Sequence, residues 1–379
     1  MLTRSIYDEE HTMFRDSVRK FFDRELRPNH EAWEKEGIVP RDFWLRSGEQ
    51  GLLCPQVPEE YGGPGGDYRY LSVVNEELGF AGASGPGFAV HSDICAGYIL
   101  KYGSEDQKKE WLPKMVTGEA IAAIAMTEPN TGSDLQGVKT TALMDGNHYV
   151  VNGSKTFISN GQNADLVIVV AKTDPKQGAR GVSLILVETD RDGYRPGRNL
   201  DKMGLHAADT SEMSFEDVRV PTSNLLGTEE GQGFIQLMQE LPQERLSIAV
   251  GALATAQYAY DLTVEYTKER KAFGKSIFDF QNTRFKLADL KTQLELGWAF
   301  TDKCIEHHAR GELSASDAAM AKLWTTEMLG RVTDECVQLF GGYGYMNEYP
   351  IARLYTDARV QRIYGGTSEI MKELISRSL

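Results

Sequence analysis

The spacing of apolar residues changes twice along the chain and divides it into three segments. Residues 5–120 carry apolar side chains at helical spacing, which predicts helices over 9–26, 70–78 and 92–102. A further helix is expected after Ser104, because Ser104-Glu-Asp-Gln107 is typical of an N-cap with a capping box. The first segment is therefore predicted to be helical.

The second segment has the short β-branched apolar runs that are typical of strands. These runs lie at 149–151, 166–170 and 182–187, and glycine-containing turn pairs at 145–146, 152–153 and 192–193 separate them. No pattern of helix length intervenes, so an antiparallel β domain is favoured over a sheet built from βαβ units.

The third segment returns to helical spacing over 246–266, 281–307 and 316–339. Long helices with short connections indicate an antiparallel bundle. We therefore predict an α+β protein with three domains: a helical domain over 1–121, a β domain over 122–232 and a helical bundle over 233–379.

Composition and charge exclude several classes of protein. The 379 residues carry a net charge of −14, which gives no general attraction for nucleic acid. The longest apolar runs are too short for insertion into a membrane, and the four cysteines are scattered without metal-ligand spacing, so no metal site is predicted. The N-terminus is charged and lacks the apolar stretch of a secretory signal. We expect buried thiols in a reducing compartment, either the cytoplasm or, for a mature eukaryotic chain, the mitochondrial matrix.

Two segments carry candidate chemistry. Residues 125–134 (AMTEPNTGSD) crowd small, turn-forming and hydroxyl residues into the junction of the helical and β segments, where backbone N–H groups and hydroxyls can lie against a flat ligand. Residues 338–345 (QLFGGYGY) place glycines directly after a helix, which permits close approach of another molecule. Each segment alone could be an ordinary turn or helix end. No G-x-G-x-x-G follows a strand, and no P-loop motif occurs.

Together these two segments resemble the signatures of the acyl-CoA dehydrogenase family. Further matching pieces follow in the family's order at 155–161, 202–204, 215–221, 270–275 with Gln281, and 364–370. The resemblance covers essentially the whole chain, and it is closest to the long-chain branch because of 240–246 (ELPQERL) and 363–367 (IYGGT).

The resemblance implies an N-terminal α-helical domain, a central antiparallel β-barrel or sandwich domain and a C-terminal four-helix bundle. It implies non-covalent FAD as cofactor, an acyl-CoA substrate, transfer of electrons to electron-transferring flavoprotein, and a homo-oligomer, usually a tetramer. The reaction expected is dehydrogenation to the trans-2-enoyl-CoA, in which a carboxylate takes the α-proton and flavin N5 the β-hydride.

The identity of the base is the point at which this sequence departs from many relatives. Many members carry a catalytic Glu within a C-terminal Tyr-Glu-Gly-Thr stretch, but this chain has Tyr364-Gly365-Gly366-Thr367. The branch that includes the long-chain and isovaleryl enzymes places the Glu on a bundle helix before an Arg, which here is Glu244-Arg245. We predict Glu244 as the base, with Gly365 leaving room for it. Pro242 is expected to start or kink its helix.

The resemblance also assigns roles to other positions. Residues expected to bind FAD are Met126, Thr127, Gly132, Ser133, Phe157, Ile158, Ser159, Arg270, Phe273, Gln281, Gln338, Gly341, Gly342, Thr367 and Glu369. Residues expected to contact the substrate are Ser133, Arg245, Gly365 and Gly366. Arg270, Phe273 and Gln281 are expected to reach FAD across a subunit boundary.

The acyl tail and the electron acceptor leave alternatives open. Small and apolar residues at 85–90 favour a medium, long or branched acyl chain over butyryl. The alternatives to a dehydrogenase are a relative with altered chemistry (an acyl-CoA oxidase, an enoyl-CoA reductase or a monooxygenase) and a flavin-bearing scaffold without turnover.

Overall fold

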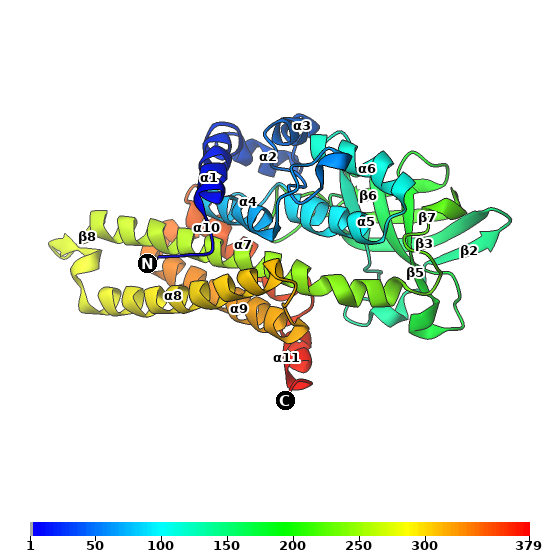
Figure 1. Ribbon diagram of the computed structural model, residues 1–379. Helices are drawn as coiled ribbons and strands as arrows, with labels where there is room; N and C mark the ends of the chain where they lie inside the picture. Colours follow the sequence, from blue (N-terminus) through cyan, green and yellow to red (C-terminus); the bar gives the residue numbers. More distant parts are fainter. Residues whose placement is uncertain (1–2) are drawn as a thin grey trace.

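A computed structural model describes residues 3–379 and shows two helical parts with a β-sheet domain at one end (Figure 1). Met1 and Leu2, with which the predicted first domain starts, lie outside the described residues. In the structure the first strand begins at Ala122 and the long helix α7 at Gly233. The boundaries drawn from the sequence at 121/122 and 232/233 stay a prediction.

The N-terminal part is helical, as predicted. Its main elements are α1 (Glu9–Phe21), η1 (Phe22–Leu26), α2 (His30–Glu36), α3 (Arg41–Glu49), α4 (Tyr68–Ala81), η3 (Ala89–Cys95), α5 (Ala96–Tyr102) and α6 (Glu105–Thr117). The capping box at the start of α6 is confirmed, because the Ser104 hydroxyl accepts from the Gln107 N–H and the Gln107 side chain accepts from the Ser104 N–H.

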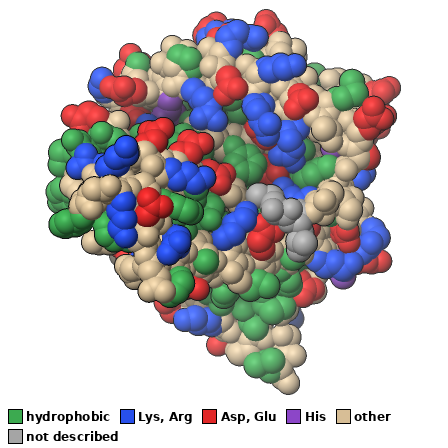
Figure 2. Space-filling model, turned by 90° about the vertical axis from the view of Figure 1, so that its left-hand side faces the viewer, with side chains coloured by type: hydrophobic (Ala, Val, Ile, Leu, Met, Phe, Trp, Pro, Cys, Tyr) green, Lys and Arg blue, Asp and Glu red, His purple; other side chains and the backbone are tan. Residues whose placement is uncertain are grey.

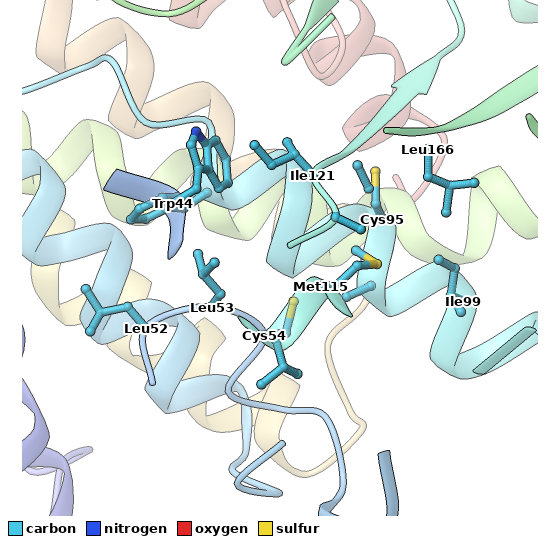
Figure 3. Packing of buried hydrophobic residues seen from close by; sticks show 14 of the residues in the cluster. Trp44, Leu52, Leu53, Cys54, Cys95, Ile99, Met115, Ile121 and Leu166 are labelled. Atoms are coloured by element: carbon cyan, nitrogen blue, oxygen red, sulfur yellow. The ribbon is translucent and has the colours of Figure 1, made fainter. Parts of the chain in front are cut away.

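An aromatic core holds these helices together. The Phe88 ring is stacked on Phe43 at a centroid distance of 5.9 Å and lies edge-on to Trp44 at 4.9 Å. Figure 3 shows the neighbouring part of this core, where Trp44 lies beside Leu53 and Ile121 and the two buried cysteines Cys54 and Cys95 point into the same apolar cluster. All four cysteines are free and buried, which confirms that part of the expectation.

The middle part is a seven-stranded sheet in the order β1-β4-β2-β3-β7-β6, with β5 paired to β4. Its strands are β1 (Ala122–Ala125), β2 (Thr141–Asp145), β3 (His148–Ser159), β4 (Leu166–Lys172), β5 (Val182–Glu188), β6 (Tyr194–Asn199) and β7 (Thr210–Pro221). Most neighbours are antiparallel, as predicted, but β1 pairs with β4 in parallel. That part of the prediction was wrong because the β2–β3 hairpin lies between β1 and β4 in the chain and lets β4 return in the direction of β1.

The continuous apolar run of β4 is explained by burial on both faces. Leu166, Ile168 and Val170 pack into the core shared with the N-terminal helices, whereas Val167 and Val169 pack into the interior of the curled sheet. Because successive side chains of a strand point to opposite faces, such a strand shows no polar alternation. The sheet is thereby fixed against α5 and η3, which carry residues of the candidate site.

The C-terminal part contains three long helices, α7 (Gly233–Glu269), α8 (Gln281–Ala309) and α9 (Ala315–Phe340), and the shorter α10 (Pro350–Ala358) and α11 (Ser368–Ser376). The strands β8 (Lys271–Ala272) and β9 (Lys275–Ser276) form a small hairpin between α7 and α8. Of the two expectations for Pro242, that it starts its helix was wrong, because α7 begins at Gly233 and contains Pro242, and that it kinks the helix stays a prediction. Proline within a helix removes one backbone hydrogen bond and clashes with the carbonyl four residues earlier, at a cost of about 3 kcal/mol, so packing must hold α7 together there.

Candidate active site

Glu244 lies on α7 where this helix faces α5 of the N-terminal part. Its side chain is only 5% exposed. The Tyr98 hydroxyl of α5 donates a hydrogen bond of 3.0 Å to Glu244 Oε1. Burial raises the pKa of Glu244 to about 7, while the Tyr98 hydrogen bond and the charge of Arg245 oppose that rise. A carboxyl group with such a pKa can take a proton from a weakly acidic carbon near neutral pH.

The loop with Gly365 and Gly366 lies against the same stretch of α7. Arg245 Nε donates to the Gly365 carbonyl at 3.3 Å, and Lys322 Nζ of α9 donates to the Gly366 carbonyl at 2.6 Å. Both glycines have positive φ angles, +63° and +99°, which other residues rarely adopt. The loop is therefore fixed by its backbone conformation and by two cationic side chains.

An apolar side chain of α7 lies directly beside Gly365. A Cβ atom at Gly365 would lie 2.4 Å from Cδ1 of Ile248, one turn after Glu244 on α7. The Glu244 carboxylate is not among the atoms within 4 Å of that position. Gly365 therefore makes room for this apolar neighbour, which shares a face of α7 with Glu244, and the expectation that it also leaves room for the carboxylate stays a prediction.

The segment around Met126 to Ser133 is held against the sheet by a buried ion pair. Lys155 of β3 is fully buried, and its Nζ donates to Glu128 at 2.9 Å, to the Met126 carbonyl at 3.2 Å and to the Val170 carbonyl at 2.7 Å. Burial lowers the pKa of Lys155 to about 8, against the opposing effect of Glu128. This ion pair fixes the predicted cofactor loop so that Gly132 and Ser133 lie exposed at its outer end.

Phe157 stands out beside this loop. Its ring is 66% exposed, its φ angle is +60°, and it lies where the β3–β7 register shifts between Lys155 and Ile158. A strained, exposed aromatic residue at a bulge is typical of a functional position. Ile158 differs from its neighbours because its side chain is buried in the sheet core, so only its backbone faces a ligand on the Phe157 side.

Thr367 and Glu369 lie at the start of α11, directly after the glycine loop. The Thr367 hydroxyl is the N-cap of this helix and accepts from the Ile370 N–H at 3.3 Å. Glu369 is exposed in the first turn. This part of the predicted flavin site therefore adjoins the loop that contacts Arg245.

The remaining predicted cofactor residues lie at the opposite end of the molecule. Arg270, which follows α7, lies over the Tyr343 ring at 5.4 Å, which brings it beside the segment with Gln338, Gly341 and Gly342. Phe273 at the β8–β9 hairpin is 95% exposed, and Gln281 is also exposed. Figure 2 looks onto this end of the molecule, where hydrophobic side chains gather beside Lys and Arg side chains.

The length of α7 separates these two groups of residues. Arg270 follows Glu244 by 26 residues, almost all of them helical, and a helix rises 1.5 Å per residue, so the separation is about 39 Å. Figure 1 shows the sheet at one end of α7 and the β8–β9 hairpin at the other. One protomer therefore does not bring the two groups together.

Three features of this site were missed by the sequence analysis. Tyr98 donates a hydrogen bond to the predicted base. Ile248 lies beside Gly365, and Lys322 donates to the glycine loop. Each lies within an ordinary helical pattern, where no local motif distinguishes it. Among the described residues, no group of three or more acidic, His or Cys side chains is arranged to hold a metal ion, and no helix is long and apolar enough to cross a membrane.

Comparison with protein families decides the relationship that the motifs suggested. Three consecutive family models match: "Acyl-CoA dehydrogenase, N-terminal domain" over 8–119, "middle domain" over 123–218 and "C-terminal domain" over 231–379. The chain belongs to the acyl-CoA dehydrogenase family. The predicted fold class is thereby confirmed, and the chain is an oxidoreductase of a family that acts on CH–CH bonds.

Individual relatives agree with this family. The chain is 52% identical to the long-chain specific acyl-CoA dehydrogenase of Sus scrofa mitochondria, over 99% of this chain and 88% of the relative. It is 38% identical to acryloyl-CoA reductase (NADH) of Anaerotignum propionicum, over 98% and 94%. An acyl-CoA dehydrogenase structure from Geobacillus kaustophilus has a TM-score of 0.97 and 52% identity, and the match covers 99% of both chains.

Acyl-CoA dehydrogenases use FAD, and the residues of this chain fit such a cofactor. A glutaryl-CoA dehydrogenase of Mycobacterium smegmatis, 30% identical with a TM-score of 0.93 over 100% of this chain and 96% of that one, was solved with FADH2. Here the exposed Phe157 ring can cover one edge of a flat ring system. A Cβ at Gly132 would meet nothing within 4 Å, so the loop opposite is open for close approach.

Proposed function

We propose that the chain dehydrogenates a medium-chain, long-chain or branched acyl-CoA to the trans-2-enoyl-CoA, with Glu244 as the base. The observation that carries this proposal is the buried carboxyl of Glu244, whose pKa is raised to about 7 and which lies one helical turn before Ile248, the α7 residue beside Gly365. A thioester α-proton is only weakly acidic, so the base must be desolvated and held in place.

We assign proton abstraction and cofactor binding to different residues of the chain. Glu244 takes the α-proton, and its burial keeps water away from the carboxyl group. Bound FAD supplies the acceptor for the β-hydride. We assign one side of its flavin ring to Met126, Thr127, Gly132, Ser133, Phe157, Ser159 and the Ile158 backbone, and another side to Thr367 and Glu369.

The glycine loop is suited to contact the thioester. Arg245 donates a hydrogen bond to the Gly365 carbonyl, and Lys322 donates one to the Gly366 carbonyl. In a trans peptide the N–H of the next residue points away from the carbonyl oxygen. The N–H groups of Gly366 and Thr367 are thereby directed away from these cations, and backbone donors near the base can stabilise charge that develops on a thioester oxygen. Arg245 is mostly buried against this loop, and its predicted contact with CoA stays a prediction.

We further propose that FAD binds between copies of the chain. The Glu244 end and the Arg270 end of α7 are about 39 Å apart, yet both carry residues assigned to one cofactor. A second copy that places Arg270, Phe273, Gln281, Gln338, Gly341 and Gly342 against the first copy's flavin site resolves this separation. Phe273, Tyr343 and Tyr345 are all exposed at this end and together support such an interface, and a tetramer is the assembly we expect.

Only part of the 85–90 segment is available to border the acyl tail. A Cβ at Gly87 would lie 1.9 Å from Asn160 Oδ1, and a Cβ at Gly85 would lie 2.8 Å from Ala207 Cβ, so both glycines serve the contact with the sheet domain. Phe88 is in the aromatic core. Ala89 and Val90 are half-buried, Val90 packs partly against the N-terminal core, and we assign their exposed sides to the border of the tail. The name of the Sus scrofa relative supports a long chain for this enzyme.

The base assignment is tested by Glu244→Gln, with Glu240→Gln as the matched control one turn earlier on the same helix. Glu240 pairs with Lys101 and Tyr102 at a partly buried position. We expect the Glu244 variant to fold, retain yellow FAD and lose essentially all anaerobic bleaching of the flavin by acyl-CoA. The Glu240 variant should bleach. A Glu244→Gln protein with wild-type turnover would refute the assignment.

Electron-transferring flavoprotein is the proposed electron acceptor. The second candidate is the reverse reaction, reduction of an enoyl-CoA with NADH as electron donor, because the chain is similar to an acryloyl-CoA reductase (NADH). Stopped-flow reoxidation of the acyl-CoA-reduced enzyme by electron-transferring flavoprotein or by air separates a dehydrogenase from an oxidase. Turnover of an enoyl-CoA with NADH would instead assign the reductase.

A further inference from the structure

Tyr98 contacts Glu244 across the boundary between the N-terminal and C-terminal helices. The Tyr98 side chain is 1% exposed, and its hydroxyl donates to Glu244 Oε1 at 3.0 Å. The pKa of Tyr98 is raised well above its usual range, first by burial and then by the Glu244 charge, so the hydroxyl keeps its proton. Tyr98 is therefore a permanent donor to one oxygen of the carboxyl group.

A second Tyr–Glu pair lies one helical turn away and fixes the register of the two helices. The Tyr102 hydroxyl of α5 donates to Glu240 Oε1 of α7 at 2.6 Å, and Lys101 forms an ion pair with the same carboxylate. Residues four apart lie above one another on a helix. α5 and α7 thus meet through two neighbouring Tyr–Glu contacts, of which the inner one is fully buried and the outer one is partly buried.

We propose that Tyr98 is a positioning residue for the base: its hydroxyl occupies Oε1 of Glu244 and leaves Oε2 as the oxygen that takes the α-proton. This inference rests on the proposed role of Glu244. A carboxylate has two equivalent oxygens and can turn about its last bond. A fixed donor on one of them removes that freedom and holds the other in one direction.

Other charged and titratable groups lie beside Glu244 on α7 and on the elements packed against it. Arg245 favours the charged form, and Glu240 on the same helix opposes it. The groups on neighbouring elements are Asp93 and Cys95 of η3, Lys101 and Tyr102 of α5, His308 of α8 and Lys322 of α9. Among these groups, Tyr98 is the direct hydrogen-bond donor to the Glu244 carboxylate. Its removal takes away a group that stabilises the charged form.

The test compares Tyr98→Phe with Tyr102→Phe in the FAD-loaded enzyme. The rise of kcat/KM with pH reports ionisation of the base. In Tyr98→Phe this rise should move up by about one to two pH units, the size expected for loss of a hydrogen bond to a charged group. Activity should then be lost mainly at neutral pH and recovered in alkaline buffer. Tyr102→Phe, which removes the same atom from the outer pair, should leave the profile in place.

Incorporation of 2,3-difluorotyrosine at position 98 provides a second test that preserves the shape of the side chain. The more acidic phenol is a stronger donor, so the rise should move to lower pH. An unchanged profile in both variants, or a loss of activity that is equal at every pH, overturns the positioning role. If Glu244→Gln is inactive in the same experiments, only the role of Tyr98 fails. If Glu244→Gln turns over, the proposed function itself fails.

Discussion

We predict that the proposed base can be moved from α7 to the glycine loop, and the structure indicates what the move requires. The simplest variant combines Glu244→Gly with Gly365→Glu. The new side chain at 365 would begin 2.4 Å from Ile248 Cδ1 and would need a φ angle of +63°. Ile248→Val removes that methyl group, so the triple variant should recover more dehydrogenation than the double variant.

The cost in stability is tolerable. A non-glycine residue in the left-handed conformation costs about 1–2 kcal/mol, a glycine within α7 about 1 kcal/mol and Ile→Val about 1 kcal/mol. The sum is about 3–4 kcal/mol, which a typical domain stability of about 5–15 kcal/mol can absorb. Overpacking by a methylene group costs typically about 1–3 kcal/mol, and relief of about 1.4 kcal/mol of this cost in the transition state corresponds to about tenfold in rate.

The assay is anaerobic flavin bleaching by acyl-CoA under single-turnover conditions. Glu244→Gly alone sets the baseline without a base. We expect the double variant to exceed this baseline slightly and the triple variant to exceed the double variant about tenfold. Equal rates in the double and triple variants would show that Ile248 does not limit a side chain at 365. A triple variant that binds FAD but stays at the baseline would refute the interchange of the two positions.

Two further predictions concern buried charges. Lys155→Met should lower the free energy of unfolding, measured in urea, by about 3–5 kcal/mol and release FAD, because it leaves the Glu128 carboxylate without its cation. The double variant Lys155→Met with Glu128→Gln should lose less stability. An equal loss in both variants would exclude the unpaired charge as the cause. Folding raises the Glu244 pKa from 4.5 to about 7, so ionisation of this group destabilises the native state. At acidic pH, Glu244→Gln should therefore have the same free energy of unfolding as wild type. As pH rises from 4.5 to about 7, the variant should become more stable than wild type by up to about 3 kcal/mol, and this difference should not grow at higher pH. A stability difference of the same size at pH ~4 and pH ~8 would contradict this prediction.

Local patterns predicted the elements but not all of their ends or pairings. The capping box at Ser104 could be located from the sequence because its two hydrogen bonds join residues three apart. The parallel pairing of β1 with β4 could not, since it depends on where a hairpin folds back. The start of α7 was misjudged because Pro242 suggests a helix boundary, whereas tertiary packing holds the helix through it.

The sequence pointed to some residues of the candidate site and not to others, because only some of them belong to local motifs. Motifs identified Glu244 and the glycine loop because both belong to short, recognisable stretches. Tyr98 and Lys322 reach the site from other helices, and their contacts arise only when α5, α7 and α9 pack. The buried Ile158 shows a further limit, since a motif assigns a role to a position without revealing which face its side chain occupies.

The length of α7 has a consequence for genetics. If one cofactor needs the Glu244 end of one protomer and the Arg270 end of another, a base-less chain still offers an intact far end to its partner. A chain with a defective Arg270 end likewise retains a working base. Two inactive alleles of these different kinds would then complement each other in mixed assemblies, whereas two alleles with defects at the same end would not.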